Sequence, residues 1–239
     1  MNTKATVRRA KSLKPYVLVN MAMTADAKIA TVNRAISTFG SQRDHDHLYE
    51  LRATVDAVMS GARTVDSNPV TLGPGSLKYR RQRIKRGLAE YNLRVIVSGS
   101  GTINPEAEIF RQRFSPIIVL TTQRASPESL ALLRTLADEV KICGRSEVDL
   151  PSAMRWLRDK WRVKRLLCEG GAELNEAMFR ARQVDEVYTT VCPKIFGGRT
   201  APTMAEGAGT KNLDGATNLE LRTARQIGAE LFLKFRVKG

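Results

Sequence analysis

Short apolar runs alternate with amphipathic segments along most of this chain, and this alternation constrains the fold more than any single motif. The apolar runs predict strands at 16–22, 57–60, 93–97, 116–121, 139–142, 165–168 and 186–191. The segments between them predict helices at 42–54, 126–137, 150–160 and 172–180. This pattern favours an α/β fold, an open and mostly parallel sheet with helices on both faces. Such a sheet binds ligands beyond the carboxyl ends of its strands.

Three segments depart from the alternation. Residues 219–226 and 230–237 alternate in polarity around Gly228, which predicts a C-terminal antiparallel hairpin. Residues 66–92 are rich in glycine, proline and basic residues, which predicts loops and one exposed basic helix. Residues 1–13 carry basic side chains and no acid, so we expect a flexible tail there and a single domain at 14–239.

The composition narrows the class of protein. With 239 residues, 42% of them hydrophobic, the chain can bury a sizeable core. No apolar run approaches the ~20 residues of a membrane span and no signal-peptide core is present, so we expect a cytoplasmic protein without membrane contact. The formal charge of +15 indicates anionic partners, but no nucleic-acid-binding motif accompanies it, and we expect no nucleic-acid partner. The spacing of Cys143, Cys168 and Cys192 favours buried free thiols.

The segment 165–179 has the form of a ligand-binding turn. A short apolar run ends in Glu169, Gly170 and Gly171, and an amphipathic helix follows. Glycines let a ligand approach the backbone, and the N–H groups of a first helical turn attract anions, so a phosphate-bearing ligand fits. A tight turn without a ligand explains these residues equally well. The sequence contains neither the dinucleotide-binding G-x-G-x-x-G pattern nor a P-loop.

Small or polar residues end three further strands, so we expect one site across 23–28, 61–64, 98–101 and 169–172. Asn20 interrupts an apolar strand and faces either a partner or a pocket. Arg52 has a planar fork that suits a phosphate, or it is a surface arginine with a buried stem. Asp26 is a functional carboxylate or the cap of a turn, and Lys28 is a ligand contact or a surface amine.

Two histidines, His45 and His47, are the obvious candidates for metal binding. On a helix, side chains two residues apart diverge by about 200°, so both are expected to be solvated and no metal site is predicted. The sequence also lacks the nucleophile–base patterns of triad hydrolases.

Five segments, in order, resemble one family. They are 15–29 (PYVLVNMAMTADAKI), 51–65 (LRATVDAVMSGARTV), Asn68-Pro69 with 93–98, 167–174 (LCEGGAEL) and 184–197. Together they are similar to the reductase of riboflavin biosynthesis, which occurs as the C-terminal half of a bacterial bifunctional deaminase–reductase and as a stand-alone archaeal or fungal enzyme. The resemblance covers about residue 14 to the end.

The resemblance implies a dihydrofolate-reductase-like fold, a homodimer and NADPH as cofactor. The implied substrate is a phosphorylated pyrimidine, a ribosylaminopyrimidine 5′-phosphate, whose ribosyl group is reduced to ribityl by hydride transfer from nicotinamide C4 to C1′. The cofactor carries such chemistry while the protein positions the reactants. The deaminase half and its zinc signature are absent from this sequence, so we expect no deamination.

The resemblance also implies roles for individual residues. It implies substrate contacts from Asn20, Lys28, Arg52 and Glu169, with Asp26 and Glu169 as candidate catalytic carboxylates. It implies cofactor contacts from Thr64, Asn68, Ser98, Gly99, Ser100, Gly170, Gly171, Ala172, Glu173 and Leu174. This chain has Ala27 where the family commonly has glycine, and Asn20 where many bifunctional enzymes have lysine. By position alone, Arg124 is a candidate partner for the 2′-phosphate of NADPH.

Two other functions compete with this interpretation. Another NADPH-dependent reductase on the same scaffold would bind the cofactor but would turn over neither the uracil nor the diaminopyrimidinone form of the substrate. A nucleic-acid-binding protein would show an affinity that depends steeply on salt and that disappears when residues 1–14 and 78–86 are neutralised.

Overall fold

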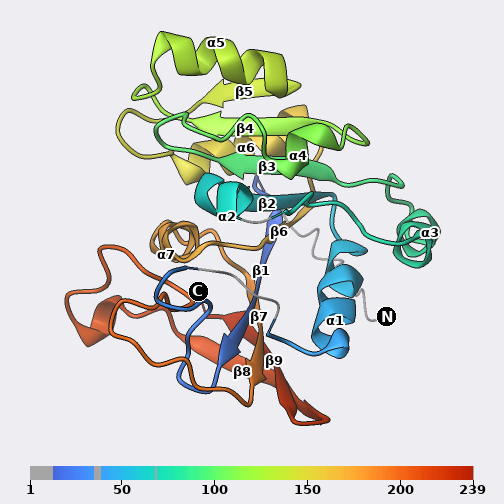
Figure 1. Ribbon diagram of the computed structural model, residues 1–239, viewed down its shortest axis with the longest axis vertical. Helices are drawn as coiled ribbons and strands as arrows, with labels where there is room; N and C mark the ends of the chain where they lie inside the picture. Colours follow the sequence, from blue (N-terminus) through green and yellow to red (C-terminus); the bar gives the residue numbers. More distant parts are fainter. Residues whose placement is uncertain (1–12, 35–38, 68, 239) are drawn as a thin grey trace, which may run out of the picture.

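One mixed sheet of nine strands organises the computed structural model, which describes residues 13–34, 39–67 and 69–238. Its strand order is β5-β4-β3-β2-β6-β1-β7-β9-β8 (Figure 1). The strands are β1 Tyr16–Thr24, β2 Ala57–Gly61, β3 Leu93–Val97, β4 Ile117–Thr121, β5 Glu139–Ile142, β6 Arg165–Cys168, β7 Glu186–Cys192, β8 Leu219–Ile227 and β9 Glu230–Val237. β1 to β7 pair in parallel, and β7, β9 and β8 pair antiparallel. The predicted α/β class, parallel sheet and C-terminal hairpin are therefore confirmed.

The helices lie on both faces of the sheet. They are α1 Gln42–Arg52, α2 Ala62–Ser67, α3 Leu77–Lys85, α4 Glu108–Arg111, α5 Pro127–Leu136, α6 Leu150–Lys160 and α7 Ala172–Arg180, with a 3₁₀ turn at Leu213–Gly215. Ser126 caps α5 through a hydrogen bond from Ser129 N–H, as its position before Pro127 predicts. None of the described helices is long and apolar enough to cross a membrane.

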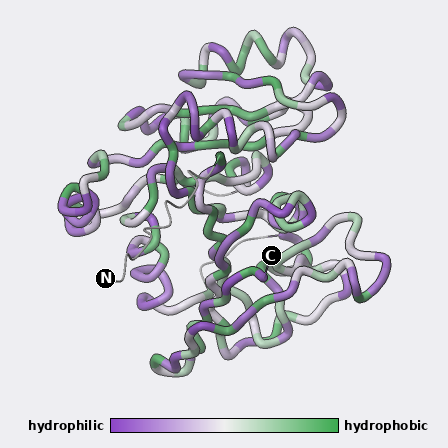
Figure 2. Tube along the Cα trace, turned by 180° about the vertical axis from the view of Figure 1, so that it is seen from behind, coloured by the Kyte–Doolittle hydropathy of each residue, from purple (hydrophilic) through white to green (hydrophobic). Residues whose placement is uncertain are grey.

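Two hydrophobic cores sandwich the sheet, because neighbouring side chains along a strand point to opposite faces. In β1, Val17 and Val19 join the core that α6 and α7 cover, whereas Leu18 joins the core under α1, α2, α4 and α5. Figure 2 shows the hydrophobic residues concentrated along the strands between these layers.

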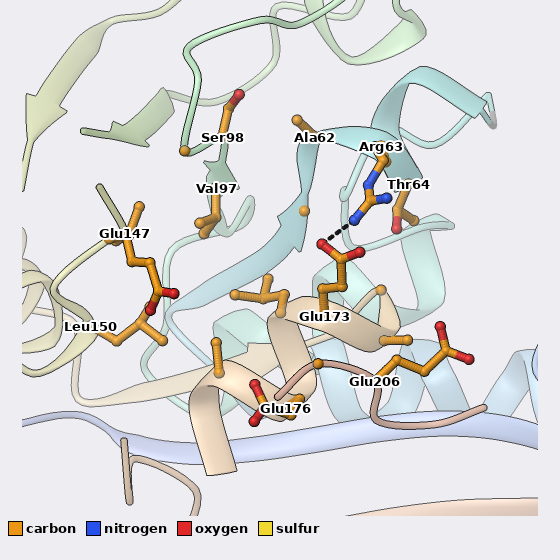
Figure 3. Close-up of a pocket in the computed structure, with 18 of the residues that line it drawn as sticks. Ala62, Arg63, Thr64, Val97, Ser98, Glu147, Leu150, Glu173, Glu176 and Glu206 are labelled. Atoms are coloured by element: carbon orange, nitrogen blue, oxygen red, sulfur yellow. Dashed lines mark ion pairs between the residues drawn. The ribbon is translucent and has the colours of Figure 1, made fainter. Parts of the chain in front are cut away.

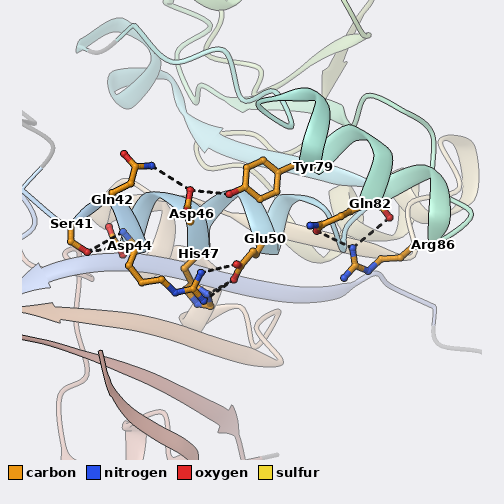
Figure 4. A network of polar contacts seen from close by, with 10 residues as sticks. Ser41, Gln42, Asp44, Asp46, His47, Glu50, Tyr79, Gln82 and Arg86 are labelled. Atoms are coloured by element: carbon orange, nitrogen blue, oxygen red, sulfur yellow. Dashed lines mark hydrogen bonds and ion pairs between the residues drawn. The ribbon is translucent and has the colours of Figure 1, made fainter. Parts of the chain in front are cut away.

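The segment 66–92 differs from its prediction. Helix α3 is not exposed on all sides, because Tyr79 and Arg83 are buried. Arg83 donates to the carbonyls of Arg52 (2.6 Å), Val55 (2.7 Å) and Ala89 (2.9 Å), and burial lowers its pKa to about 10. The Tyr79 hydroxyl donates to Asp46 of α1 at 2.9 Å (Figure 4). Buried carbonyls at the end of a helix need donors, and α3 supplies them for α1.

The cysteines are buried free thiols, as predicted. Burial raises the pKa of Cys143 to about 11 and those of Cys168 and Cys192 to about 12. A thiol reacts as its thiolate, so these side chains act as small core residues and are not nucleophiles at neutral pH.

Candidate active site

A cavity of about 890 Å³ lies at the carboxyl ends of β2, β3 and β6 (Figure 3). Its walls come from the start of α2, the loops after β3 and β4, the segment 146–151 that leads into α6, helix α7 and two loops, 29–34 and 202–208. The volume lies within the range of ~300–1,000 Å³ that is typical of ligand sites. The position at the strand ends is the one that an open parallel sheet predicts.

Most of the predicted cofactor residues meet in this cavity. Eight of the ten line it: Thr64, Ser98, Gly99, Ser100, Gly171, Ala172, Glu173 and Leu174. Of the other two, Gly170 does not line the cavity, and Asn68 is outside the described residues. The strand end 23–28 does not reach the cavity, and Ile29 and Ala30, the next residues, line it instead.

Hydrogen bonds to β2 fix the turn between β6 and α7. The Gly170 carbonyl accepts from Gly61 N–H at 2.7 Å and from Ser60 Oγ at 3.0 Å, and Glu169 N–H donates to the Met59 carbonyl at 2.9 Å. Gly170 has φ +78°, where a side chain is disfavoured, and the peptide bond to Gly171 is cis. Gly170 is therefore the residue of this turn whose backbone conformation favours glycine.

The start of α7 fits a phosphate group. Gly171 is the N-cap and has no side chain to accept from the first-turn N–H groups. Such N–H groups, together with the positive end of the helix dipole, attract anions. Gly171 and Ala172 line the cavity, so a diphosphate bound there can reach the backbone of this turn.

Four arginines line the same cavity, and three of them are paired with glutamates. The pairs are Arg34–Glu206 (3.9 Å), Arg180–Glu147 (3.0 Å) and Arg63–Glu173. Arg124 forms no ion pair with any described residue, and its guanidinium donates to the Ser146 carbonyl at 3.4 Å. Arg124 is thus the cavity arginine whose charge is not offset locally.

A buried ion pair lies on the other side of the glycine turn. Arg52 Nε and Nη2 donate to the two carboxylate oxygens of Glu169, each at 2.6 Å, and Nη1 donates to the Gly73 carbonyl at 2.6 Å. Burial opposes the charge of Arg52, but Glu169 outweighs it, so the pKa of Arg52 is raised. The interpretation of Arg52 as a surface arginine is therefore wrong. Glu169 is held on the α1 side of the turn and does not line the cavity.

Asp26 accepts three hydrogen bonds and holds a neighbouring loop. The donors are Thr24 Oγ1 (2.5 Å), Gly197 N–H (2.7 Å) and Phe196 N–H (3.2 Å). These bonds, with that from Thr24 the strongest, lower the pKa of Asp26, so the ionised carboxylate is favoured. The adjacent Ala27 adopts φ +62°, so the turn keeps the conformation that glycine favours.

The remaining predicted residues lie along β1 and α1. Lys28 donates to the Ala201 carbonyl at 2.9 Å. Asn20 is buried, and its Oδ1 accepts no hydrogen bond from any described residue. His47 packs against Tyr188 and Phe232, at 5.8 and 5.6 Å between ring centroids, so the prediction that it is solvated is wrong. No cluster of three potential metal ligands occurs among the residues that the structure describes.

Comparison with known proteins identifies the family. The model of the RibD C-terminal domain matches residues 15–233. This chain belongs to the RibD C-terminal domain family. A Methanothermobacter thermautotrophicus protein named 2,5-diamino-6-ribosylamino-4(3H)-pyrimidinone 5′-phosphate reductase is 33% identical over 227 residues, which cover 95% of this chain and 100% of that protein. The riboflavin biosynthesis protein RibD of Actinobacillus pleuropneumoniae is 26% identical over 227 residues, which cover 94% of this chain and 57% of that protein.

Solved structures share the fold of this chain. A pyrimidine reductase-like protein from Corynebacterium diphtheriae has a TM-score of 0.78 at 23% identity, covering 94% of this chain and 92% of that one. The riboflavin biosynthesis reductase of Saccharomyces cerevisiae has a TM-score of 0.69 at 16% identity, covering 97% and 93%. The dihydrofolate-reductase-like fold expected from the sequence is therefore confirmed.

Several cavity residues were not predicted from the sequence. Arg63, the segment 146–151 and the segment 202–208 all line the cavity. Arg63 lies within a matched motif and next to Thr64, so its position was a usable signal. The two segments carry no ligand-binding pattern, and only the folded chain brings them to the strand ends.

Proposed function

We propose that this chain is an NADPH-dependent reductase that converts the ribosyl group of a ribosylaminopyrimidine 5′-phosphate to ribityl. The cavity at the start of α7, which gathers eight residues expected for the cofactor, is the observation that carries the proposal. The archaeal relative matched over its whole length supports the diaminopyrimidinone form as the first substrate to test, with the uracil form second. The free thiols fit a reducing compartment, and we place the protein in the cytoplasm.

Different cavity residues contact different parts of the proposed cofactor. When bound, NADPH supplies the hydride that reduces C1′ of the sugar. The N–H groups at the start of α7 hold the diphosphate, and Thr64 and the glycine turn border it. Ser98, Gly99 and Ser100 contact the adenosine side.

The proposed substrate side lies around Glu169. Arg52 donates one hydrogen bond to each carboxylate oxygen of Glu169 and so fixes the carboxylate beside the glycine turn. A carboxylate fixed in this way can accept hydrogen bonds from the hydroxyl groups of the sugar without moving. Asn20 and Lys28 provide further polar contacts. Asp26, with its lowered pKa, serves as an acceptor and as the anchor of the 196–197 loop.

Consumption of NADPH by the purified protein with each of the two pyrimidine phosphates tests this proposal. Turnover with either one, together with a ribityl product identified by mass spectrometry, is the expected result. Binding of NADPH without turnover of either would instead support a reductase of another small substrate on the same scaffold.

Arg124 is expected to favour NADPH over NADH. Arg124 is the cavity arginine that forms no ion pair with any described residue, so its guanidinium is available for the 2′-phosphate. Replacing Arg124 by alanine should raise the KM for NADPH about tenfold, the size of a lost charged hydrogen bond, and leave that for NADH unchanged. Steady-state kinetics with both cofactors measure the ratio of the KM for NADPH to the KM for NADH. An unchanged ratio would assign the 2′-phosphate to another residue.

The C-terminal hairpin is the proposed contact of a homodimer. It exposes four large apolar side chains, Leu219 (37%), Leu221 (54%), Ile227 (38%) and Leu231 (44%). An exposed apolar edge of a sheet is a site for association. Leu221→Lys is expected to convert dimers into monomers in sedimentation experiments, whereas Leu132→Lys on α5, 43% exposed, should not. Wild-type protein that sediments as a monomer would contradict the proposal.

A further inference from the structure

Two oppositely charged side chains meet at the edge of the cavity. Arg63 is the second residue of α2 and Glu173 is the second residue of α7, and both line the cavity. Figure 3 shows the two side chains pointing toward one another, joined by an ion pair. They are 66% and 61% exposed, so the pair is open to solvent.

This ion pair lies where α7 attracts anions. The positive end of a helix favours a carboxylate in its first turn, and Glu173 is the acidic residue there. A phosphate group bound at the same helix end meets Glu173 as a like charge and Arg63 as an opposite charge. The two anions therefore compete for one guanidinium.

The competition favours the phosphate. An ion pair between exposed side chains is weak in water, so little free energy is lost when Arg63 leaves Glu173. A guanidinium binds phosphate oxygens through two parallel hydrogen bonds, and the N–H groups of α7 hold the same phosphate in place. Arg63 thus gains a stronger partner than the one it gives up.

We infer that Arg63 binds the diphosphate of the dinucleotide cofactor, and that Glu173 competes with the cofactor for this arginine and lowers its affinity. The inference rests on the proposed NADPH-dependent function. The Glu173 side chain thus opposes cofactor binding, whereas its backbone N–H group, which belongs to the anion-binding turn, favours it.

Calorimetric titration of NADP⁺ into the full chain tests whether Arg63 exchanges Glu173 for the cofactor diphosphate. Arg63→Gln is expected to weaken binding about tenfold, through loss of a charged hydrogen bond. Glu173→Gln is expected to tighten binding about threefold, the size of a weak exposed pair. In the Glu173→Gln background, Arg63→Gln should weaken NADP⁺ binding by a larger factor than in the wild type, because the arginine is no longer held by the carboxylate.

Glu147→Gln is the matched control. It removes an exposed carboxylate from the same cavity, but one that pairs with Arg180 and not with Arg63, so affinity should change less than about twofold. If Glu173→Gln binds NADP⁺ as weakly as the wild type or more weakly, the pair only supports the turn and the inference is wrong. Wild-type protein that binds no NADP⁺ would overturn the cofactor assignment as well, which is a distinguishable result.

Discussion

Arg52→Met is expected to lower the free energy of unfolding by about 3–5 kcal/mol, since it leaves a buried carboxylate without its counter-charge. The side chains of Arg52 and Glu169 are only 7% and 12% exposed, and two hydrogen bonds of 2.6 Å join them. The substitution also removes the donor to the Gly73 carbonyl. Denaturant unfolding of the two proteins measures the difference, and reductase activity should fall with it because Glu169 loses its fixed position.

The same helix offers a control for this prediction. Arg43 pairs with Glu50 at 2.7 Å, but the side chains are 39% and 37% exposed. Arg43→Met should therefore change the free energy of unfolding by less than about 1 kcal/mol. Equal effects of the two substitutions would contradict a structural role for the buried pair.

Gly171→Val is expected to weaken NADPH binding about 100-fold, which corresponds to a loss of about 2.8 kcal/mol of binding free energy. A Cβ atom at Gly171 would lie 3.2 Å from Thr64 Oγ1, and both residues line the cavity. The branched side chain would stand at the α7 N–H groups proposed to hold the diphosphate. Titration of the reduced cofactor, followed by its fluorescence, measures the loss.

A graded substitution separates this effect from misfolding. Gly171→Ala adds one methyl group, which Thr64 can accommodate by a shift of a few tenths of an ångström. It should weaken binding far less than valine, with thermal unfolding close to that of the wild type. If valine leaves the affinity for NADPH unchanged, the cofactor does not lie against this turn.

The strands and the longer helices could be predicted from the sequence because their signals are local. β3 begins and ends at the expected residues, Leu93 and Val97, and Ser126 marks the start of α5. Helices α2 and α4, of six and four residues, are too short to show a helical period. The buried face of α3 could not be predicted, since it depends on contacts between Arg83 and the end of α1.

The candidate site likewise contains residues that the sequence predicts and residues that only the folded chain brings together. The glycine turn and the start of α7 are encoded by adjacent residues, so Gly171 and Ala172 were found in the cavity as predicted. The partner of Glu169 lies 117 positions away along the chain, and no local pattern indicates that Arg52 would reach it. Loops such as 202–208 join the cavity only through the fold.

Transfer of isotope from the cofactor to the product tests the central claim most directly. The chain would be incubated with NADPH carrying deuterium at the transferable C4 position and with the diaminopyrimidinone phosphate or the uracil phosphate. The proposed reaction predicts a ribityl product that carries the deuterium at C1′, detected by mass spectrometry and NMR. Recovery of both substrates unchanged, or of a product without deuterium at C1′, would contradict the assignment of this chain as an NADPH-dependent ribosylaminopyrimidine phosphate reductase.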